Sequence, residues 1–269
     1  MMEVTLTRQA AERLIEAATS APSIHNSQPW RFVAWPADRV IEIYADPART
    51  LRRGDPRGRA VHIACGSALF NLRLAVAQAG CEPVARLLPS PRDPLLLASV
   101  RLAGPYRPRP AERDLYAAIR RPPGRGRLTG RPPRGVLLAL KEAAALEGAS
   151  LRELGQADAL RTLAVISTSA GDRASWLRAG QAAQHVLLLA THHGMQAALL
   201  GPALEAPGAP AHGETVQAGE HPAVVLQFGP GHPRPPTARR PVAQVLRLRS
   251  AGAEQQATTP GRHRVTAGR

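Results

Sequence analysis

Aromatic residues are scarce in this sequence, and their scarcity limits both the core and the surface. Only 3% of the 269 residues are aromatic although 44% are hydrophobic, so we expect a core of Leu, Val, Ile and Ala. Proteins that bind single-stranded nucleic acid stack the bases on aromatic side chains within a basic groove. Here the basic residues lie in loops and near the end of the chain without interleaved aromatics, which argues against a specific nucleic-acid partner.

Lysine is almost absent, and arginine carries the positive charge. Lys141 is the only lysine among 35 basic residues, and the formal net charge is +15. Together with 26 prolines and 23 glycines, this composition is typical of a GC-rich genome, so the charge by itself is a weak functional signal. Binding to nucleic acid through charge alone is the alternative that the composition leaves open.

Cysteine, metal-ligand clusters and membrane-length apolar runs are also lacking. Cys65 and Cys81 lie in or at the end of an apolar helical pattern, which predicts buried, inert thiols. His192 and His193 are adjacent and would point to different faces of a helix, so no metal site is predicted. The first residues lack the layout of a signal peptide, and no apolar run is long enough to span a membrane uninterrupted. We therefore expect a cytoplasmic protein without a membrane partner.

Hydrophobic periodicity predicts both helices and strands, and hence an α+β fold. The expected helices are residues 7–19, 59–80, 110–119, 136–148 and 173–194. The expected strands are residues 31–35, 40–44, 83–88, 96–102, 151–154, 162–168 and 223–228, and residues 197–202 are expected to make a turn. The last twenty or so residues have little apolar content, which predicts a disordered tail.

The two longest predicted helices resemble each other. Both are apolar around most of their circumference, which predicts helices buried on nearly all sides. Residues 66–80 align with residues 180–194 without a gap, and both stretches begin and end on glycine. Alanine-rich helices also align by chance, so the repeat is a hypothesis. If the repeat is real, the chain has two related α+β halves, and a cofactor would bind at the seam between them.

The most informative stretch is residues 21–31, Ala-Pro-Ser-Ile-His-Asn-Ser-Gln-Pro-Trp-Arg. Pro22 and Pro29 exclude a continuous helix and favour extended geometry in the residues before them. Between them lie five hydrogen-bonding side chains, those of Ser23, His25, Asn26, Ser27 and Gln28. A polar loop fixed between regular elements is a common ligand site. Because Ser, Asn and Pro are also ordinary turn residues, a plain turn stays open as the alternative.

A second candidate site is a basic segment rich in Pro and Gly near the middle of the chain. Arg127, Thr129 and Arg131 recur there at alternate positions, and guanidinium groups suit bidentate contact with a phosphate. Arg239 and Arg240, near the end of the chain, are candidates for the same anion. A disordered linker is the alternative interpretation of the basic segment.

The motif Pro-Ser-x-x-Asn-x-Gln-Pro-Trp at residues 22–30 is similar to the flavin-contacting loop of the nitroreductase family, and the histidine before the asparagine resembles its Acg-like branch. Weaker matches follow in the same order at residues 55–59, 65–75, 176–181 and 236–241, so the resemblance covers most of the chain. It implies a nitroreductase-like α+β fold of two related half-domains, packed through two long central helices, in a monomer that mimics a nitroreductase dimer. The implied halves are residues 1–119 and 120–249, followed by the tail at 250–269.

The resemblance also implies FMN as the cofactor. The implied ring-edge contacts are Ser23, Asn26, Gln28 and the backbone near Leu200 and Gly201, with His25 as a group that tunes the flavin or a structural member of the loop. The implied phosphate contacts are Arg127, Thr129, Arg131, Arg239 and Arg240. NADH or NADPH would reduce the flavin, which would then reduce a small nitro-aromatic or quinone-like acceptor. Because this chemistry belongs to the cofactor, no catalytic residue is predicted.

The sequence departs from the family pattern in two places. Gly130 stands where the family prefers a polar residue. Residues 154–168 form a much shorter segment than in relatives, where part of it makes a lid over the flavin. The short segment keeps a second function open, that of an FMN-binding or storage protein without significant turnover.

Overall fold

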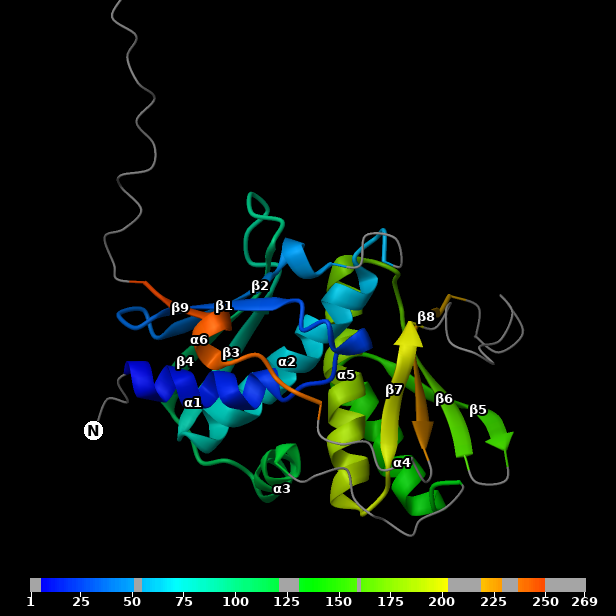
Figure 1. Cartoon of the computed structure of the whole chain (residues 1–269). Helices are drawn as coiled ribbons and strands as arrows, with labels where there is room; N and C mark the ends of the chain where they lie inside the picture. Colours follow the sequence, from blue (N-terminus) through cyan, green and yellow to red (C-terminus); the bar gives the residue numbers. More distant parts are fainter. Residues whose placement is uncertain are drawn as a thin grey trace, which may run out of the picture.

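The structure is a computed structural model that describes residues 6–50, 55–120, 131–158, 161–202, 219–228 and 237–249. The predicted tail at residues 250–269 and the predicted phosphate contacts Arg127 and Thr129 lie outside these ranges. The described residues form a mixed α+β arrangement, in which one sheet lies on either side of a central pair of long helices (Figure 1).

Most predicted elements are present close to their predicted bounds. The helices are α1 (Arg8–Thr19), α2 (Arg59–Gln78), α3 (Pro110–Ile119), α4 (Arg134–Leu146), α5 (Arg173–His192) and α6 (Val242–Val245), with the 3-10 turns η1 (Ile24–Asn26) and η2 (Pro47–Arg49). The strands are β1 (Trp30–Trp35), β2 (Val40–Ala45), β3 (Cys81–Leu87), β4 (Leu96–Pro105), β5 (Ser150–Asp158), β6 (Arg161–Thr168), β7 (Ala197–Pro202), β8 (His221–Phe228) and β9 (Leu246–Leu248). The helix α6 and the strand β9 are not among the predicted elements, because both are too short to show a period.

The first sheet has the strand order β3-β4-β2-β1-β9. Its predicted strands β1 and β2 form an antiparallel hairpin, and their alternating burial matches the alternating sequence. Strand β9 is parallel to β1, so the chain needs a long crossover to add it. Figure 1 shows β9 beside β1, far from β8. The end of the segment that was assigned to the second half, residues 120–249, therefore completes the sheet of the first half.

The second sheet has the strand order β5-β6-β8-β7. The turn predicted at residues 197–202 is wrong, since these residues form strand β7. The edge position of β7 explains this, because an edge strand tolerates a terminal proline such as Pro202. Leu199 pairs with Leu226 and Gly201 with Val225, so Leu200 is an extra residue, a β-bulge.

The central helices α2 and α5 run side by side and make closely matched contacts. Gly66 faces Leu177 and Gly180, and Gly180 faces Ile63 and Gly66, so the helix backbones touch. The hydroxyl of Ser67 donates a hydrogen bond to the Gly180 carbonyl over 3.0 Å. Further along, the Asn71 and Gln184 amides are joined over 2.8 Å, while the rings of Phe70 and His185 stack with centroids 4.7 Å apart. Small residues at the crossing therefore let polar and aromatic pairs fill the rest of the contact.

The core divides between the two sheets and includes helix α2 almost entirely. The prediction of a buried helix is confirmed, because nearly every residue of α2 is buried. By length and composition α2 would be able to cross a membrane, but 94% of its apolar window is buried inside the fold. Cys65 and Cys81 are both free and buried, as predicted. Burial raises the pKa of the Cys65 thiol, so this thiol stays protonated and inert.

Candidate functional site

The polar loop before β1 has an unusual backbone. Three of its non-glycine residues, His25, Asn26 and Gln28, have positive φ angles of 51°, 53° and 48°. Left-handed geometry is disfavoured for residues other than glycine, and each instance costs about 1–3 kcal/mol. Within the loop, the backbone N–H of Gln28 donates a hydrogen bond to the Ser23 hydroxyl over 3.0 Å. Such strain persists only where other contacts hold it, so the loop needs partners.

The C-terminal segment, residues 237–240, supplies these partners to Gln28. This side chain is only 4% exposed. Its amide nitrogen donates to the Ala238 carbonyl over 3.2 Å, and its oxygen accepts from the Arg240 backbone amide over 2.8 Å. The Gln28 side chain thus hydrogen-bonds to the backbone on both sides of Arg239, although the residues lie more than two hundred positions apart.

Asn26 and Arg239 make the second connection. The Arg239 guanidinium donates to the Asn26 side-chain oxygen over 2.7 Å and to the Ser20 carbonyl over 3.2 Å. The Asn26 nitrogen donates to the Ala238 carbonyl over 3.0 Å. Burial lowers the pKa of Arg239, yet a guanidinium stays charged, so its hydrogen bonds are charge-assisted.

Arg240 anchors the same segment to the first sheet. Its guanidinium lies 3.4 Å from an Asp46 carboxylate oxygen and 3.4 Å from the Gln28 carbonyl. The side chains of Arg240 and Asp46 are 14% and 11% exposed. Because the ion pair is largely buried, it fixes the C-terminal segment relative to β1 and β2.

Strand β7 of the second sheet contacts η1, which places the loop at the seam between the two sheets. The bulge residue Leu200 is 37% exposed, an unusual position for a large apolar side chain at such a junction. On the loop, His25 is exposed, and no hydrogen bond to its ring is found among the described residues. Bulges often lie beside functional sites, where they redirect a side chain. An exposed leucine and an exposed histidine therefore border the seam.

The structure brings most of the sequence-predicted site residues together. The assembled set is Ser23, His25, Asn26 and Gln28 of the loop and Arg239 and Arg240 of the C-terminal segment. Strand β7, to which Leu200 and Gly201 belong, contacts η1 of the loop. Arg131 is separate from this set. Its guanidinium makes a two-pronged ion pair with Glu153 of β5, over 2.9 and 2.8 Å.

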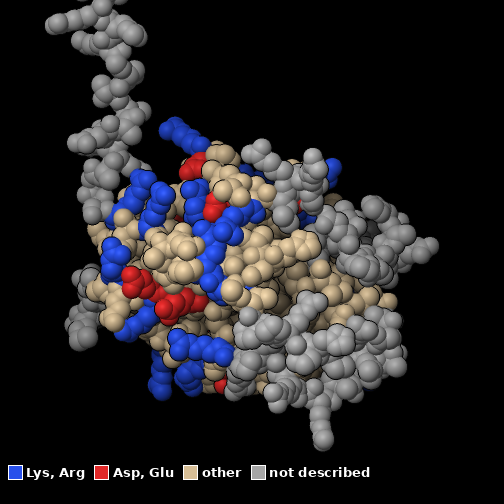
Figure 2. All heavy atoms as spheres, viewed as in Figure 1, with Lys and Arg blue, Asp and Glu red and all other residues tan. Residues whose placement is uncertain are grey.

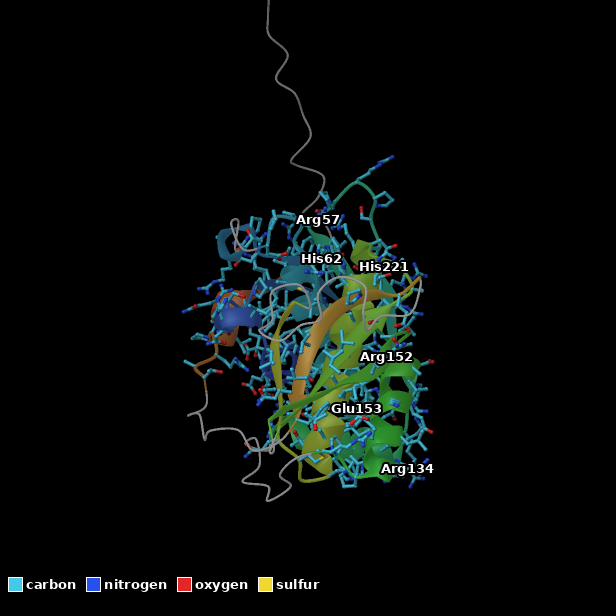
Figure 3. The ribbon with its side chains drawn as sticks, turned by 90° about the vertical axis from the view of Figure 1, so that its right-hand side faces the viewer. Arg57, His62, Arg134, Arg152, Glu153 and His221 are labelled. Atoms are coloured by element: carbon cyan, nitrogen blue, oxygen red, sulfur yellow. The ribbon has the colours of Figure 1, made fainter. Side chains whose placement is uncertain are left out.

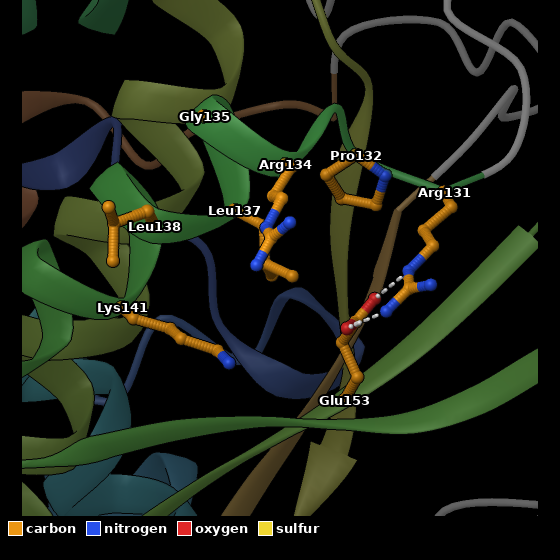
Figure 4. Close-up of a pocket in the computed structure, with 8 residues that line it drawn as sticks. All are labelled: Arg131, Pro132, Arg134, Gly135, Leu137, Leu138, Lys141 and Glu153. Carbon is orange, nitrogen blue, oxygen red and sulfur yellow. Dashed lines mark hydrogen bonds and ion pairs between the residues drawn. The ribbon is translucent and has the colours of Figure 1, made fainter.

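Arg131 lines a pocket of about 890 Å³ between α4 and β5 (Figure 4). The lining consists of Arg131, Pro132, Arg134, Gly135, Leu137, Leu138, Lys141 and Glu153. Figure 4 shows the Arg134 and Lys141 side chains directed into the space between α4 and the Arg131–Glu153 pair. With three cations and one carboxylate, the pocket favours an anionic ligand with an apolar part. Arg134 and Lys141 are not among the sequence-predicted site residues, although their spacing of seven places them on one helix face.

The opposite end of the molecule holds a buried histidine, His62 of α2 (Figure 3). Its Nδ1 lies 2.6 Å from the Gly58 carbonyl, and its Nε2 accepts a hydrogen bond from Arg173 over 2.9 Å. The ring also packs edge-on against Trp176 of α5. Burial, together with the charge of Arg173, lowers the pKa of His62 despite its contact with Gly58. Since both ring nitrogens have partners, this histidine joins α2 to α5.

Several known proteins match parts of this chain. No family model matches the chain. It is 37% identical over 100 residues to "Putative NAD(P)H nitroreductase acg" of Mycobacterium tuberculosis, covering 37% of this chain and 30% of that protein. It is 32% identical over 157 residues to "Putative NAD(P)H nitroreductase Rv3131" of the same organism, covering 58% and 45%. It also matches "Uncharacterized protein Rv3127", with 36% identity over 88 residues, covering 32% and 26%.

The matched regions therefore span less than half the length of these curated relatives. The names of two of them agree with the resemblance that the motifs at residues 22–30 indicate. On these matches, the chain is related to the nitroreductase family.

Proposed function

We propose that this chain binds FMN and passes electrons from NADH or NADPH to a small nitro-aromatic or quinone-like acceptor. The observation that carries the proposal is the assembly of the loop, the C-terminal segment and β7 at one seam. The names of the relatives, which describe NAD(P)H nitroreductases, support the reaction class.

The seam suits the ring of a flavin. An isoalloxazine needs an apolar surface and hydrogen-bonding groups at its edges. Leu200, partly exposed at the bulge of β7, offers apolar surface, and Gly201 offers backbone groups beside it. On the loop, Ser23, Asn26 and Gln28 already bond within the protein. The exposed His25 and loop backbone groups are therefore the best-placed remaining partners for the ring edge.

The phosphate of FMN needs cations, and the pocket between α4 and β5 has them. Arg131, Arg134 and Lys141 all line it. Glu153 competes for Arg131 through their ion pair, but the Arg131 side chain is 67% exposed, so exchange of Glu153 for a phosphate costs little burial. We propose that Arg131 contributes to the phosphate clamp together with Arg127 and Thr129.

We also propose that the two halves imitate the subunits of a dimer, so that the chain acts as a monomer. The contacts of α2 with α5 support this arrangement. Positions 66 and 180 face each other, and the Gly66–Leu177 approach is repeated as Gly180–Ile63. A twofold interface repeats each contact in this reciprocal way.

Bound FMN would supply the two-electron chemistry, and the protein would bind and orient. The loop, held by Arg239 and Arg240, would fix one edge of the ring. Leu200 would keep water from one part of the ring surface. We place the protein in the cytoplasm, where reduced nicotinamides are available.

A second candidate is an FMN-binding or storage protein with little turnover. The observation that favours it lies in residues 154–168, whose described part belongs to the consecutive antiparallel strands β5 and β6. No described residue of this stretch forms a helix that would cover a flavin. An open site would bind the cofactor without enclosing a substrate.

An absorption spectrum of the purified protein, before and after addition of FMN, tests both candidates. Oxidation of NADH or NADPH with a nitroarene or a quinone then separates them. Bound flavin with acceptor reduction supports the oxidoreductase, and bound flavin without it supports storage. A colourless protein that takes up no FMN contradicts both. Steeply salt-dependent binding of DNA would instead favour the charge-based alternative; Figure 2 shows the basic side chains of the viewed face on its left half and centre, interrupted by acidic and uncharged residues.

A further inference from the structure

The strained loop is held by residues that sequence analysis assigned to a phosphate. Arg239 donates to Asn26, Thr237 and the Ser20 carbonyl. These hydrogen bonds commit both terminal nitrogens of the guanidinium to groups of the protein itself. An arginine that spends its donors on neighbouring protein groups has few left for a ligand.

The amides assigned to the flavin ring are similarly occupied. Both ends of the Gln28 side chain pair with the backbone of residues 238 and 240. Both ends of the Asn26 side chain are bonded as well, to Ala238 and Arg239. The loop and the C-terminal segment therefore satisfy each other, and the backbone conformation of the loop depends on that match.

We infer that Arg239 and Arg240 are positioning residues, which hold the loop in the conformation, left-handed at His25, Asn26 and Gln28, that presents His25 at the seam with β7. The inference rests on the proposed flavin site. It differs from a phosphate contact in one respect: the two arginines would support binding of the isoalloxazine ring whether or not the ligand carries a phosphate.

Arg240 has a second attachment that strengthens this assignment. Its guanidinium also reaches the Trp30 carbonyl over 3.5 Å and the Gln244 carbonyl over 3.3 Å. The same side chain thus links the loop end, the first strand and helix α6. Helix α6 leads directly into β9, which pairs with β1, so the whole C-terminal segment is anchored on the sheet that carries the loop.

The test compares FMN with riboflavin, which lacks the phosphate. Dissociation constants for both are measured by flavin fluorescence for the full chain, for Arg239→Gln and for Arg247→Gln. Arg247 is exposed on strand β9, which follows the C-terminal segment and α6, and no hydrogen bond or ion pair of its side chain is found within the described residues. Arg247→Gln removes the same charge but no hydrogen bond to the loop, so it is the matched control.

Positioning predicts that Arg239→Gln weakens FMN and riboflavin by the same factor, roughly tenfold for one charge-assisted hydrogen bond. Arg247→Gln should leave both constants unchanged. A loss confined to FMN would instead identify Arg239 as a phosphate ligand, and no loss for either flavin would show that it is not needed. Either of these results overturns the inference.

A second measurement is independent of any flavin. The amides of Asn26, Ser27 and Gln28 bond to Ser23 and Ile24 inside the loop, and hydrogen exchange without flavin reports on these bonds. Arg239→Gln should speed their exchange while the amides of α5 stay protected. Unchanged loop protection overturns the inference.

Two remaining cases are also decided by exchange. If Arg239→Gln does not fold, Asn26→Ala removes only the partner side chain and should have the same effect on the loop. If the wild-type protein binds neither flavin, the proposed function fails. Hydrogen exchange of the loop amides in Arg239→Gln then tests the role of Arg239 without any flavin.

Discussion

Gly66 of α2 and Gly180 of α5 face each other where the two helices cross, so closely that neither has room for a Cβ atom. A Cβ on Gly66 would come within 3.0 Å of the Leu177 carbonyl oxygen, and one on Gly180 would meet the Ile63 carbonyl oxygen in the same way. Because these obstacles are helix backbone, they cannot move aside as a flexible side chain would. The crossing therefore depends on glycine at both positions.

Gly66→Ala should consequently lower the free energy of unfolding by at least ~2 kcal/mol, because overpacking forces backbone shifts. Denaturant titration followed by circular dichroism would measure the change. The matched control is Gly135→Ala in α4, where an added Cβ meets nothing within 4 Å. That change should be neutral or stabilise the protein by up to ~1 kcal/mol. Equal effects at both positions would contradict the tight crossing.

An ion pair between a partly exposed guanidinium and a buried carboxylate links α2 to the end of α4. Arg73 donates to Glu147 over 2.6 Å and to the Gln181 side chain over 2.8 Å, and the Glu147 side chain is only 7% exposed. Burial raises the pKa of Glu147, but His185 and Arg73 outweigh burial and hold that pKa below its usual value. Arg73→Met should destabilise the fold by about 3 kcal/mol, because it leaves a buried carboxylate without its main partner.

Thermal and denaturant unfolding of Arg73→Met would measure this loss. Arg8→Met is the control, since the Arg8–Glu12 pair is 3.8 Å long and its side chains are 74% and 43% exposed; such surface pairs contribute less than ~1 kcal/mol. Adding Glu147→Gln to Arg73→Met should recover part of the loss, because the amide carries no charge. No recovery would mean that packing, rather than charge, explains the defect.

Local patterns predicted most of the fold because most elements are long and periodic. The α2 and α5 helices and the strands β1 and β2 depend on residues close in sequence. Strand β9 was missed because three residues carry no period and are recruited by β1 across a crossover. Strand β7 was mistaken for a turn because Gly201 and Pro202 are ordinary turn residues, and only an edge position accommodates them.

The sequence pointed to many residues of the candidate site, but not to their arrangement in space. The prolines at 22 and 29 identified the loop, but nothing local required His25 and Gln28 to be left-handed. That conformation depends on bonds to residues 238–240, which sequence patterns cannot pair with the loop. Lys141 was visible as the only lysine, yet its pocket forms only when α4 packs beside β5.

The buried His62 predicts how stability depends on pH. Its pKa is lowered in the folded chain, mainly by burial, whereas an unfolded histidine titrates near 6.5. Below about pH 6.5 the unfolded chain therefore takes up a proton that the folded chain resists. The stabilisation is fully present above that pH and is lost as the pH falls, by up to ~1.4 kcal/mol per unit for one proton.

Unfolding of wild type and His62→Gln at pH 7.5, 6.5 and 5.5 would measure this dependence. The variant should be less stable at pH 7.5, because its amide replaces the contacts of the ring to Gly58 and Arg173 imperfectly. Its stability should fall less between pH 6.5 and 5.5 than that of wild type. His193→Gln, at an exposed position, should keep the wild-type dependence. Parallel curves for wild type and His62→Gln would show that another group controls acid stability.

Arg131 and Glu153 predict how the proposed phosphate clamp responds to a change of charge. Glu153 holds Arg131 through two hydrogen bonds and faces the pocket that Arg134 and Lys141 line. Glu153→Gln should free Arg131 and remove a negative charge that repels phosphate. We expect FMN to bind several-fold more tightly, since one charge pair near a protein surface contributes about 1 kcal/mol. Riboflavin, which has no phosphate, should bind as before.

Glu142→Gln is the control for the removal of charge alone, because Glu142 is exposed on α4 and does not line the pocket. It should change the FMN dissociation constant by less than Glu153→Gln at the same ionic strength. Arg131→Gln should have the opposite effect and weaken FMN without weakening riboflavin. If Glu153→Gln leaves FMN binding unchanged while Arg131→Gln weakens it, Glu153 does not compete for the phosphate. If neither variant alters FMN binding, the phosphate lies away from this pocket, and the clamp must be sought nearer the seam of the loop and β7.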